Sequence, residues 1–441
     1  MSGALRMFWP LFAGAMILTC FLIPASVFSQ KRGLTRTEDF VVVRGRDVAA
    51  VRGSEVGSLR LYTCRNGKCK QAPAQVDKVD ALGRYVFPQD KNRDRDGKLL
   101  DDNDEISFMA SDCGDRMGAG QRPAGVTGGA ELELRDPVDG GLAWAYLVEV
   151  PGGKPAEGLS DYVDYVAYDG AVYIRGRQFE LGYKVGRINY DRLRMRMAGG
   201  ALSDDVLDRQ RVGMEGKMAG ERSLTLAAPE SIIKVEDIAV IDGPVRVIVD
   251  EIMSVHFGAI SFQYGNELFM TFYRCGQNNE VDFKFPAAAN TLFKSLLFYW
   301  SLDLTNDVVG SYYIDPGHSE PLVIRDETRS GVPGDRPHFW WGLYGPRGAV
   351  LQALKLDDDI VQYFTCDGRW DQDPKDDGKK GDSPGRLEIG FSCHEKGKVP
   401  EKQEYHWQNY ILFPAEPTAS GLAAVKNIFE RPLSVKAGPL P

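Results

Sequence analysis

The sequence predicts a mainly β protein, an antiparallel β-sandwich or supersandwich with a smaller N-terminal β domain. Short runs of β-branched and aromatic residues alternate with Gly and Pro turns along most of the chain. One run, Arg192–Met197, alternates strictly between charged and apolar residues, as a half-buried strand does. Long helices between the strands are missing, which argues against a doubly wound parallel sheet.

Several strands are predicted before residue 150, and a Pro/Gly-rich stretch follows them. The predicted strands are Phe40–Val43, Leu59–Thr63, Ala74–Val79, Tyr85–Phe87, Ile106–Met109, Glu131–Leu134 and Ala143–Val150. The stretch Pro151–Gly158 marks the expected domain boundary. We therefore expect an N-terminal β domain over residues 30–150 and a large β-sandwich over 159–441.

The second part continues the strand pattern with two ambiguous segments and one clear helix. Strands are expected at Val172–Phe179, Gly182–Ile188, Arg192–Met197, Ile238–Ile241, Val245–Val255, Leu268–Tyr273, Val281–Phe285, His338–Tyr344, Ala349–Leu356, Ile360–Phe364, Leu387–Phe391 and Tyr405–Phe413. Ala198–Gly220 is rich in Gly and charge and reads as a long loop or a short helix. Leu292–Leu302 fits a buried strand or a helix, and Gly421–Phe429 predicts a short helix.

The first residues have the layout of a secretory signal peptide. Arg6 precedes the apolar run Met7–Phe28, and Ser29 ends a cleavage site that leaves Gln30 as the new N-terminus. A retained anchor is the alternative, but Pro10 and Pro24 suit a membrane helix poorly. We expect residues 1–29 to be removed, a periplasmic or secreted protein, and no integral membrane domain after cleavage.

Composition excludes some partners. The formal net charge is −9, and the chain has no basic stripe. Nucleic acid is therefore not expected as a partner, and neither is an anionic lipid surface.

The cysteine pattern indicates disulfides. Cys64 and Cys69 flank an Asn-Gly turn, which predicts a type I′ hairpin. The two thiols would then face each other at a non-hydrogen-bonded position, where strands approach most closely. Cys366 with Cys393 is a weaker prediction, and Cys113 and Cys275 are left either paired or free.

The segment Asp90–Glu105 predicts a calcium loop. Oxygen-bearing side chains recur at alternate positions and a Gly follows, so that the chain can bend around one hard cation. The register does not match an EF-hand loop, and the flanks read as strands. A solvated acidic turn neutralised by Arg93 and Arg95 is the alternative. The candidate ligands of a structural Ca²⁺ are Asp90, Asn92, Asp94, Asp96, Asp101 and Asp104.

An aromatic strand provides a candidate ligand site. Rings exposed in a groove stack on sugars, and the residues placed there are His338, Trp340, Trp341 and Tyr344. Packing inside a β core explains the same pattern and is the preferred reading of the two.

A second candidate site is acid–base in character. His318 lies near Asp315 and Glu320 on an expected loop, and an imidazole with a carboxylate can transfer protons. A structural role is the simpler interpretation of each of these residues, because nothing in the sequence places them near a substrate.

Two short motifs carry a resemblance. The first motif is Gln75-Val76-Asp77, which is followed by the acidic loop and Asp104–Met109. The second is Asp242–Arg246, at the start of a strand. They resemble segments of exported bacterial proteins of unknown function with a stacked-sheet fold like that of galactose mutarotase and certain polysaccharide lyases. That resemblance implies a carbohydrate-related role by analogy of fold.

Three functions are compatible with these observations. The first is a calcium-stabilised periplasmic or cell-envelope protein that binds a carbohydrate or another envelope ligand. The second is a glycan-active lyase, hydrolase or epimerase that uses His318 and a nearby carboxylate. The third is a structural envelope component that binds a protein partner through an open strand edge.

Overall fold

Antiparallel sheets make up most of the computed structural model, which confirms the predicted mainly β class. The structure describes residues 30–89, 97–118, 120–187, 189–218, 223–224, 233–257, 260–284, 293–325, 339–371, 387–400 and 404–441. The predicted signal peptide lies outside these residues.

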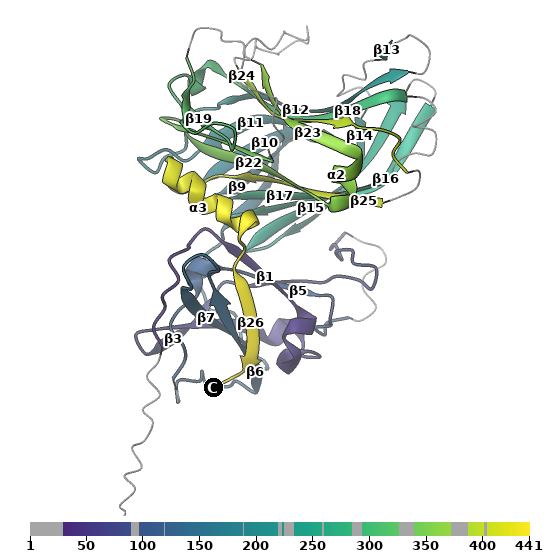
Figure 1. The fold of residues 1–441 in the computed structure, drawn as a ribbon. Helices are drawn as coiled ribbons and strands as arrows, with labels where there is room; N and C mark the ends of the chain where they lie inside the picture. Colours follow the sequence, from purple (N-terminus) through teal and green to yellow (C-terminus); the bar gives the residue numbers. More distant parts are fainter. Residues whose placement is uncertain are drawn as a thin grey trace, which may run out of the picture.

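Two small sheets enclose the N-terminal core (Figure 1). One has the order β1-β5-β4 and the other β26-β6-β7-β2-β3. Leu61, Phe108 and Leu132 are fully buried between them. The strands are β1 (Phe40–Arg44), β2 (Leu59–Arg65), β3 (Lys68–Ala72), β4 (Gln75–Asp77), β5 (Glu105–Met109), β6 (Gly128–Arg135), β7 (Leu142–Glu149) and β26 (Ser434–Pro439).

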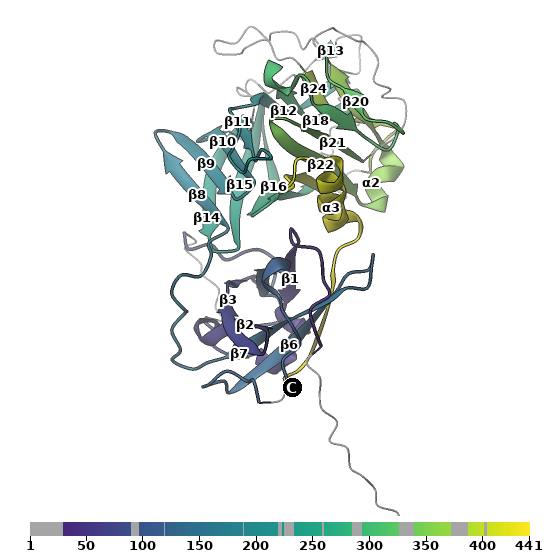
Figure 2. The same cartoon turned by 90° about the vertical axis from the view of Figure 1, so that its left-hand side faces the viewer.

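Strand β26 links distant parts of the chain. It pairs antiparallel with β6, with Ser434 opposite Arg135 and Pro439 opposite Ala130. Figure 2 shows this strand running down from the large sandwich into the N-terminal sheets. Residues 434–439 therefore lie outside the sandwich to which the sequence analysis assigned residues 159–441.

The large sandwich consists of two walls that share one core. One wall is a long sheet with the order β14-β15-β16-β17-β25-β22-β21-β19-β20, and the other is made of the sheets β11-β10-β9-β8 and β13-β12-β18-β24-β23. The strands of the long sheet are β14 (Ile233–Asp242), β15 (Arg246–Phe257), β16 (Ile260–Tyr273), β17 (Gly276–Lys284), β19 (Tyr312–Ile314), β20 (Leu322–Val323), β21 (Trp340–Gly345), β22 (Gly348–Leu356) and β25 (Glu404–Leu412). Those of the facing wall are β8 (Val163–Tyr168), β9 (Ala171–Gly176), β10 (Phe179–Lys184), β11 (Tyr190–Met195), β12 (Leu207–Met218), β13 (Ser223–Leu224), β18 (Phe293–Leu304), β23 (Phe364–Asp371) and β24 (Leu387–Glu395).

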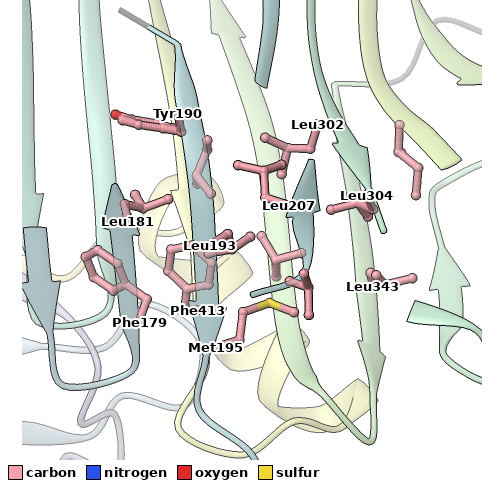
Figure 3. Packing of buried hydrophobic residues seen from close by; sticks show 14 of the residues in the cluster. Phe179, Leu181, Tyr190, Leu193, Met195, Leu207, Leu302, Leu304, Leu343 and Phe413 are labelled. Atoms are coloured by element: carbon pink, nitrogen blue, oxygen red, sulfur yellow. The ribbon is translucent and has the colours of Figure 1, made fainter. Parts of the chain in front are cut away.

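The sandwich core is filled by side chains from alternate strand positions. In β11, Leu193 and Met195 point inward beside Leu207 and Phe413 (Figure 3). Each of these four side chains is at most 3% exposed. Period-two alternation on both walls thus builds the single core that the sequence pattern predicts.

Two segments differ from their predicted states. Ala198–Gly220 was expected to be a loop or a short helix, yet most of it is strand β12, paired along its length with β18. Ile360–Phe364 was expected to be a strand, but helix α2 (Asp358–Tyr363) occupies it. Pairing with the distant strand β18 decides the state of β12. Ile360–Phe364 is an apolar run too short for its periodicity to distinguish a strand from a helix.

The predicted C-terminal helix is confirmed as α3 (Ala419–Glu430). Thr418 caps it by accepting a hydrogen bond from the Gly421 amide at 3.1 Å. Leu422 and Val425 are buried against the outer face of β21 and β22. Short 3₁₀ turns at Gly45–Asp47, Ala49–Val51, Val56–Ser58, Ala110–Asp112 and Asn306–Val308 complete the described helical structure.

Candidate functional site

The described end of the acidic loop holds a lysine between its carboxylates. Lys78 Nζ lies 2.7 Å from Asp104 Oδ2 and 3.3 Å from Asp101 Oδ2. Asp104 is fully buried. Burial raises the pKa of its carboxyl, against the opposing hydrogen bond from Lys78. The ammonium therefore places one positive charge between these two carboxyl groups.

The other four predicted calcium ligands, Asp90, Asn92, Asp94 and Asp96, lie outside the described residues. Within the part of the chain that the structure describes, no group of three His, Cys, Asp or Glu side chains is arranged to hold a metal. The calcium site thus stays a prediction.

The acid–base pair forms as a contact. His318 Nδ1 lies 2.8 Å from Asp315 Oδ1, and Asp315 Oδ2 accepts a hydrogen bond from Tyr313 Oη at 2.9 Å. Asp315 is buried, whereas the His318 side chain is 16% exposed. Glu320 is exposed and does not join them in the described contacts. A buried carboxylate can orient an imidazole for proton transfer, so the geometry fits such chemistry for His318 and Asp315 only.

The aromatic strand does not form an open stacking platform. Trp341 is fully buried, and its indole donates to Gln352 Oε1 at 2.9 Å. Lys426 Nζ lies 4.6 Å from the Trp340 ring centroid. Tyr344 stacks on Tyr312 with centroids 5.2 Å apart. The predicted ligand-binding role does not fit Trp341, which is a core residue, while His338 lies outside the described residues.

The Cys64–Cys69 hairpin is confirmed. Both residues are disulfide-bonded across the turn, where Asn66 and Gly67 adopt positive φ angles of 50° and 77°. Cys366 and Cys393 also form a disulfide, between neighbouring strands.

Cys113 and Cys275, whose pairing the sequence left open, are free and buried. Burial raises the pKa of the Cys113 thiol to about 12. Neither thiol is thus a reactive thiolate at neutral pH.

The two motifs that carry the resemblance contact each other. Gln75 Oε1 accepts hydrogen bonds from the amides of Val245 and Arg246 at 3.1 and 3.0 Å. A Cβ on Gly243 would collide with the Gln75 side chain, so the close approach requires glycine there. The motifs therefore join β4 to the β14–β15 turn.

Arg246 is the charged centre of this contact. It is 1% exposed and lies 2.7 Å from Asp77 Oδ2 and 2.8 Å from Glu105 Oε2. Its guanidinium also lies over the Tyr85 ring, 5.4 Å from the centroid. We call Arg246, Asp77, Glu105 and Gln75 the Arg246 cluster; every charge in it has a partner, which indicates a structural role.

A cavity of about 120 Å³, partly open to solvent, lies between the two walls of the large sandwich. Its walls come from both facing sheets and are mostly apolar. On the long sheet it is lined by Met270, Asn279, Val281, Leu354, Leu356 and Trp407, and on the facing wall by Tyr190, Val212, Gly213, Phe298, Tyr299, Trp300, Phe391 and Cys393. Ligand sites are concave and mostly apolar with a few polar groups, so we treat this cavity as the candidate binding site.

The lining includes buried polar atoms without a hydrogen-bond partner among the described residues. Asn279 Oδ1 lies on the long sheet and Trp300 Nε1 on the facing wall. Tyr190, by contrast, donates from Oη to Gln277 Oε1 at 2.6 Å. A buried polar atom without a partner costs about 1–3 kcal/mol, which requires an explanation such as a bound molecule.

Glu251 is another unpartnered polar group on the same interior face. It is fully buried, and neither carboxyl oxygen has a hydrogen-bond partner among the described residues. In the sheet register Glu251 lies in one row with Leu268 and the cavity-lining Val281. Burial, with a contribution from Asp250, raises the pKa of Glu251 to about 8. The carboxyl is therefore mostly neutral at pH 7.

No protein-family model matches the chain, and no curated protein was found to match it. Among the described helices, none is long and apolar enough to cross a membrane. The geometry of the sites therefore carries the functional argument.

Sequence reasoning missed the cavity and Glu251. One signal was present: Val247, Val249 and Glu251 occupy alternate positions of a single strand, so the acid falls on the core face. The cavity lining has no such signal, because it combines strands that are far apart in the chain.

Proposed function

We propose that this chain is an exported envelope protein that binds a small ligand between the two walls of its large sandwich. The observation that carries the proposal is the apolar cavity with Asn279 Oδ1 and Trp300 Nε1 unpartnered in its walls. Ligand sites combine mostly apolar walls with a few placed polar groups, and this cavity has that composition.

Export is supported by the N-terminal apolar run and by the two disulfides. Disulfides persist in oxidising compartments and are rare in the cytosol. Calcium binding by the acidic loop remains part of the proposal as a stabilising feature, separate from the cavity.

The cavity favours a ligand with an apolar body over a carbohydrate. A sugar carries several hydroxyl groups, and each needs a hydrogen-bond partner when buried. The lining offers few unpartnered polar atoms, among them Asn279 Oδ1 and Trp300 Nε1. The predicted sugar-stacking rings contact other protein groups instead, as Trp340 does with Lys426.

Thermal melting with toluene as a probe tests this function. A ligand that binds only the folded state raises the melting temperature in a saturable manner. We expect such a rise for the wild type and none for Val281→Phe, because the larger side chain fills the cavity. The exposed variant Val138→Phe is the matched control and should respond like the wild type. A wild type that toluene does not stabilise would reduce the cavity to a packing defect.

The contact between His318 and Asp315 favours a second function, an acid–base enzyme acting on glycans. His318→Asn should abolish turnover of a panel of p-nitrophenyl glycosides without changing the melting temperature. His394→Asn, at an exposed histidine, is the control. Equal rates in both variants would exclude this candidate.

A further inference from the structure

The cavity walls restrict the charge of any ligand. All fourteen lining residues are uncharged at neutral pH. Glu251, an acid on the same interior face, is buried and is not part of the lining, and neither of its oxygens has a partner among the described residues. Because no lining residue offers a counter-ion, a neutral ligand avoids the desolvation cost that a charged one would meet.

The aromatic rings of the cavity lining restrict the shape of the ligand. Phe298, Trp300, Phe391 and Trp407 surround the space, with Tyr190 at one side. Aromatic rings pack well against another ring in offset or edge-to-face geometry. An engineered enclosed cavity of about 150 Å³ accommodates benzene, so about 120 Å³ in a cavity that is partly open limits the ligand to a single ring.

The unpartnered atoms Asn279 Oδ1 and Trp300 Nε1 restrict the polar group of the ligand. Asn279 belongs to β17 on the long sheet, where its Oδ1 can only accept a hydrogen bond. Trp300 belongs to β18 on the facing wall, where its Nε1 can only donate. A ligand that satisfies both must offer one donor and one acceptor, and a single hydroxyl group offers both.

We propose that the cavity binds a neutral single-ring phenol, whose hydroxyl donates to Asn279 Oδ1 and accepts from Trp300 Nε1. This inference rests on the proposed ligand-binding function and specifies the class of ligand. The ring occupies the apolar volume beside Val281 and Leu356, and the hydroxyl bridges the two walls.

The experiment compares p-cresol with toluene, which has the same ring and methyl group but lacks the hydroxyl. Calorimetric titration of the full mature chain should give p-cresol an affinity about tenfold above that of toluene, as a satisfied buried hydroxyl provides. Asn279→Leu and Trp300→Phe should each reverse this order, because the hydroxyl then loses a partner. Toluene binding by each variant shows that its fold and cavity are intact.

The outcomes are separable from those of the proposed function. If neither compound binds the wild type, the ligand-binding function itself fails. If both bind with equal affinity, or if p-cresol keeps its advantage in both variants, the cavity binds apolar rings and the phenol assignment is overturned. Should Asn279→Leu fail to fold, Trp300→Phe decides alone.

Discussion

The Arg246 cluster and the cavity wall are both buried polar regions, and they differ in how their polar atoms are satisfied. Arg246 has two carboxylates within 2.8 Å, and Gln75 accepts hydrogen bonds from two backbone amides. Asn279 Oδ1, Trp300 Nε1 and both carboxyl oxygens of Glu251 are buried atoms without hydrogen-bond partners among the described residues. The first arrangement is complete as folded, whereas in the second the proposed ligand would satisfy Asn279 and Trp300. The contrast separates a structural contact from a candidate site without reference to residue type.

Replacing Arg246, the centre of the Arg246 cluster, should cause the largest loss of stability. Arg246→Met leaves Asp77 and Glu105 buried without their counter-charge, and we expect a loss of about 3–5 kcal/mol in the free energy of unfolding. Urea denaturation measures it. The control is Arg347→Met, since Arg347 also bridges two carboxylates but at the surface, where a change of about 1 kcal/mol or less is expected. Similar losses in both variants would contradict the structural role given to the cluster.

Replacing Glu251, the unpartnered acid near the cavity, should change how the stability of the fold depends on pH. The pKa of Glu251 is raised from its ordinary value of 4.5 to about 8 in the folded chain, which therefore keeps a proton that the unfolded chain releases between these values. Wild-type stability should fall as the pH rises from 5 to 8, by roughly 2–4 kcal/mol.

Glu251→Gln should remove most of this slope, as followed by urea midpoints at several pH values. The exposed Glu157→Gln variant should keep the wild-type profile. Parallel profiles for wild type and Glu251→Gln would show that Glu251 ionises normally in the fold.

Disturbing the close contact between Gly243 and Gln75 should cause a smaller loss of stability. Gly243→Ala forces a methyl group into the Gln75 side chain, which three hydrogen bonds hold in place. We expect a loss of about 1–3 kcal/mol by urea denaturation, as is usual for overpacking. Gly57→Ala is the control, because a Cβ there meets nothing within 4 Å. An unchanged midpoint for Gly243→Ala would mean that Gln75 moves aside freely.

The acidic loop should show the smallest effect, because Lys78 already offsets part of the negative charge of Asp101 and Asp104. If the remaining acids bind calcium, a chelator should lower the free energy of unfolding by about 1 kcal/mol. Lys78→Met should enlarge the chelator effect, since calcium then becomes the main counter-charge. Melting curves that a chelator leaves unchanged in both proteins would rule out the calcium site.

Local signals explain what could be predicted from the sequence. The Cys64–Cys69 disulfide follows from an Asn-Gly turn, and helix α3 from a short apolar period behind the capping Thr418. Both depend on neighbours within a few residues. The class of fold follows in the same way, from alternation repeated in many strands.

Contacts between distant segments explain which features could not be predicted from the sequence. Strand β12 is rich in Gly and charge, and its pairing with β18 settles its state. The sequence favours a core position for the aromatic strand but leaves a stacking role open for Trp341, which its burial and its contact with Gln352 decide. The cavity needs both walls in position, so that the candidate site appears only in three dimensions.

Strand β26 has a consequence for the order of folding. It is the edge strand next to β6, and the paired residues Ser434 and Arg135 are 299 residues apart in the chain. During synthesis, β6 emerges long before β26, so that the side of β6 facing β26 stays unpaired until the whole sandwich has been made. Unpaired strand edges are aggregation-prone, and this one is exposed for most of the synthesis of the chain. The N-terminal sheet therefore gains its last strand only when residues 434–439 arrive.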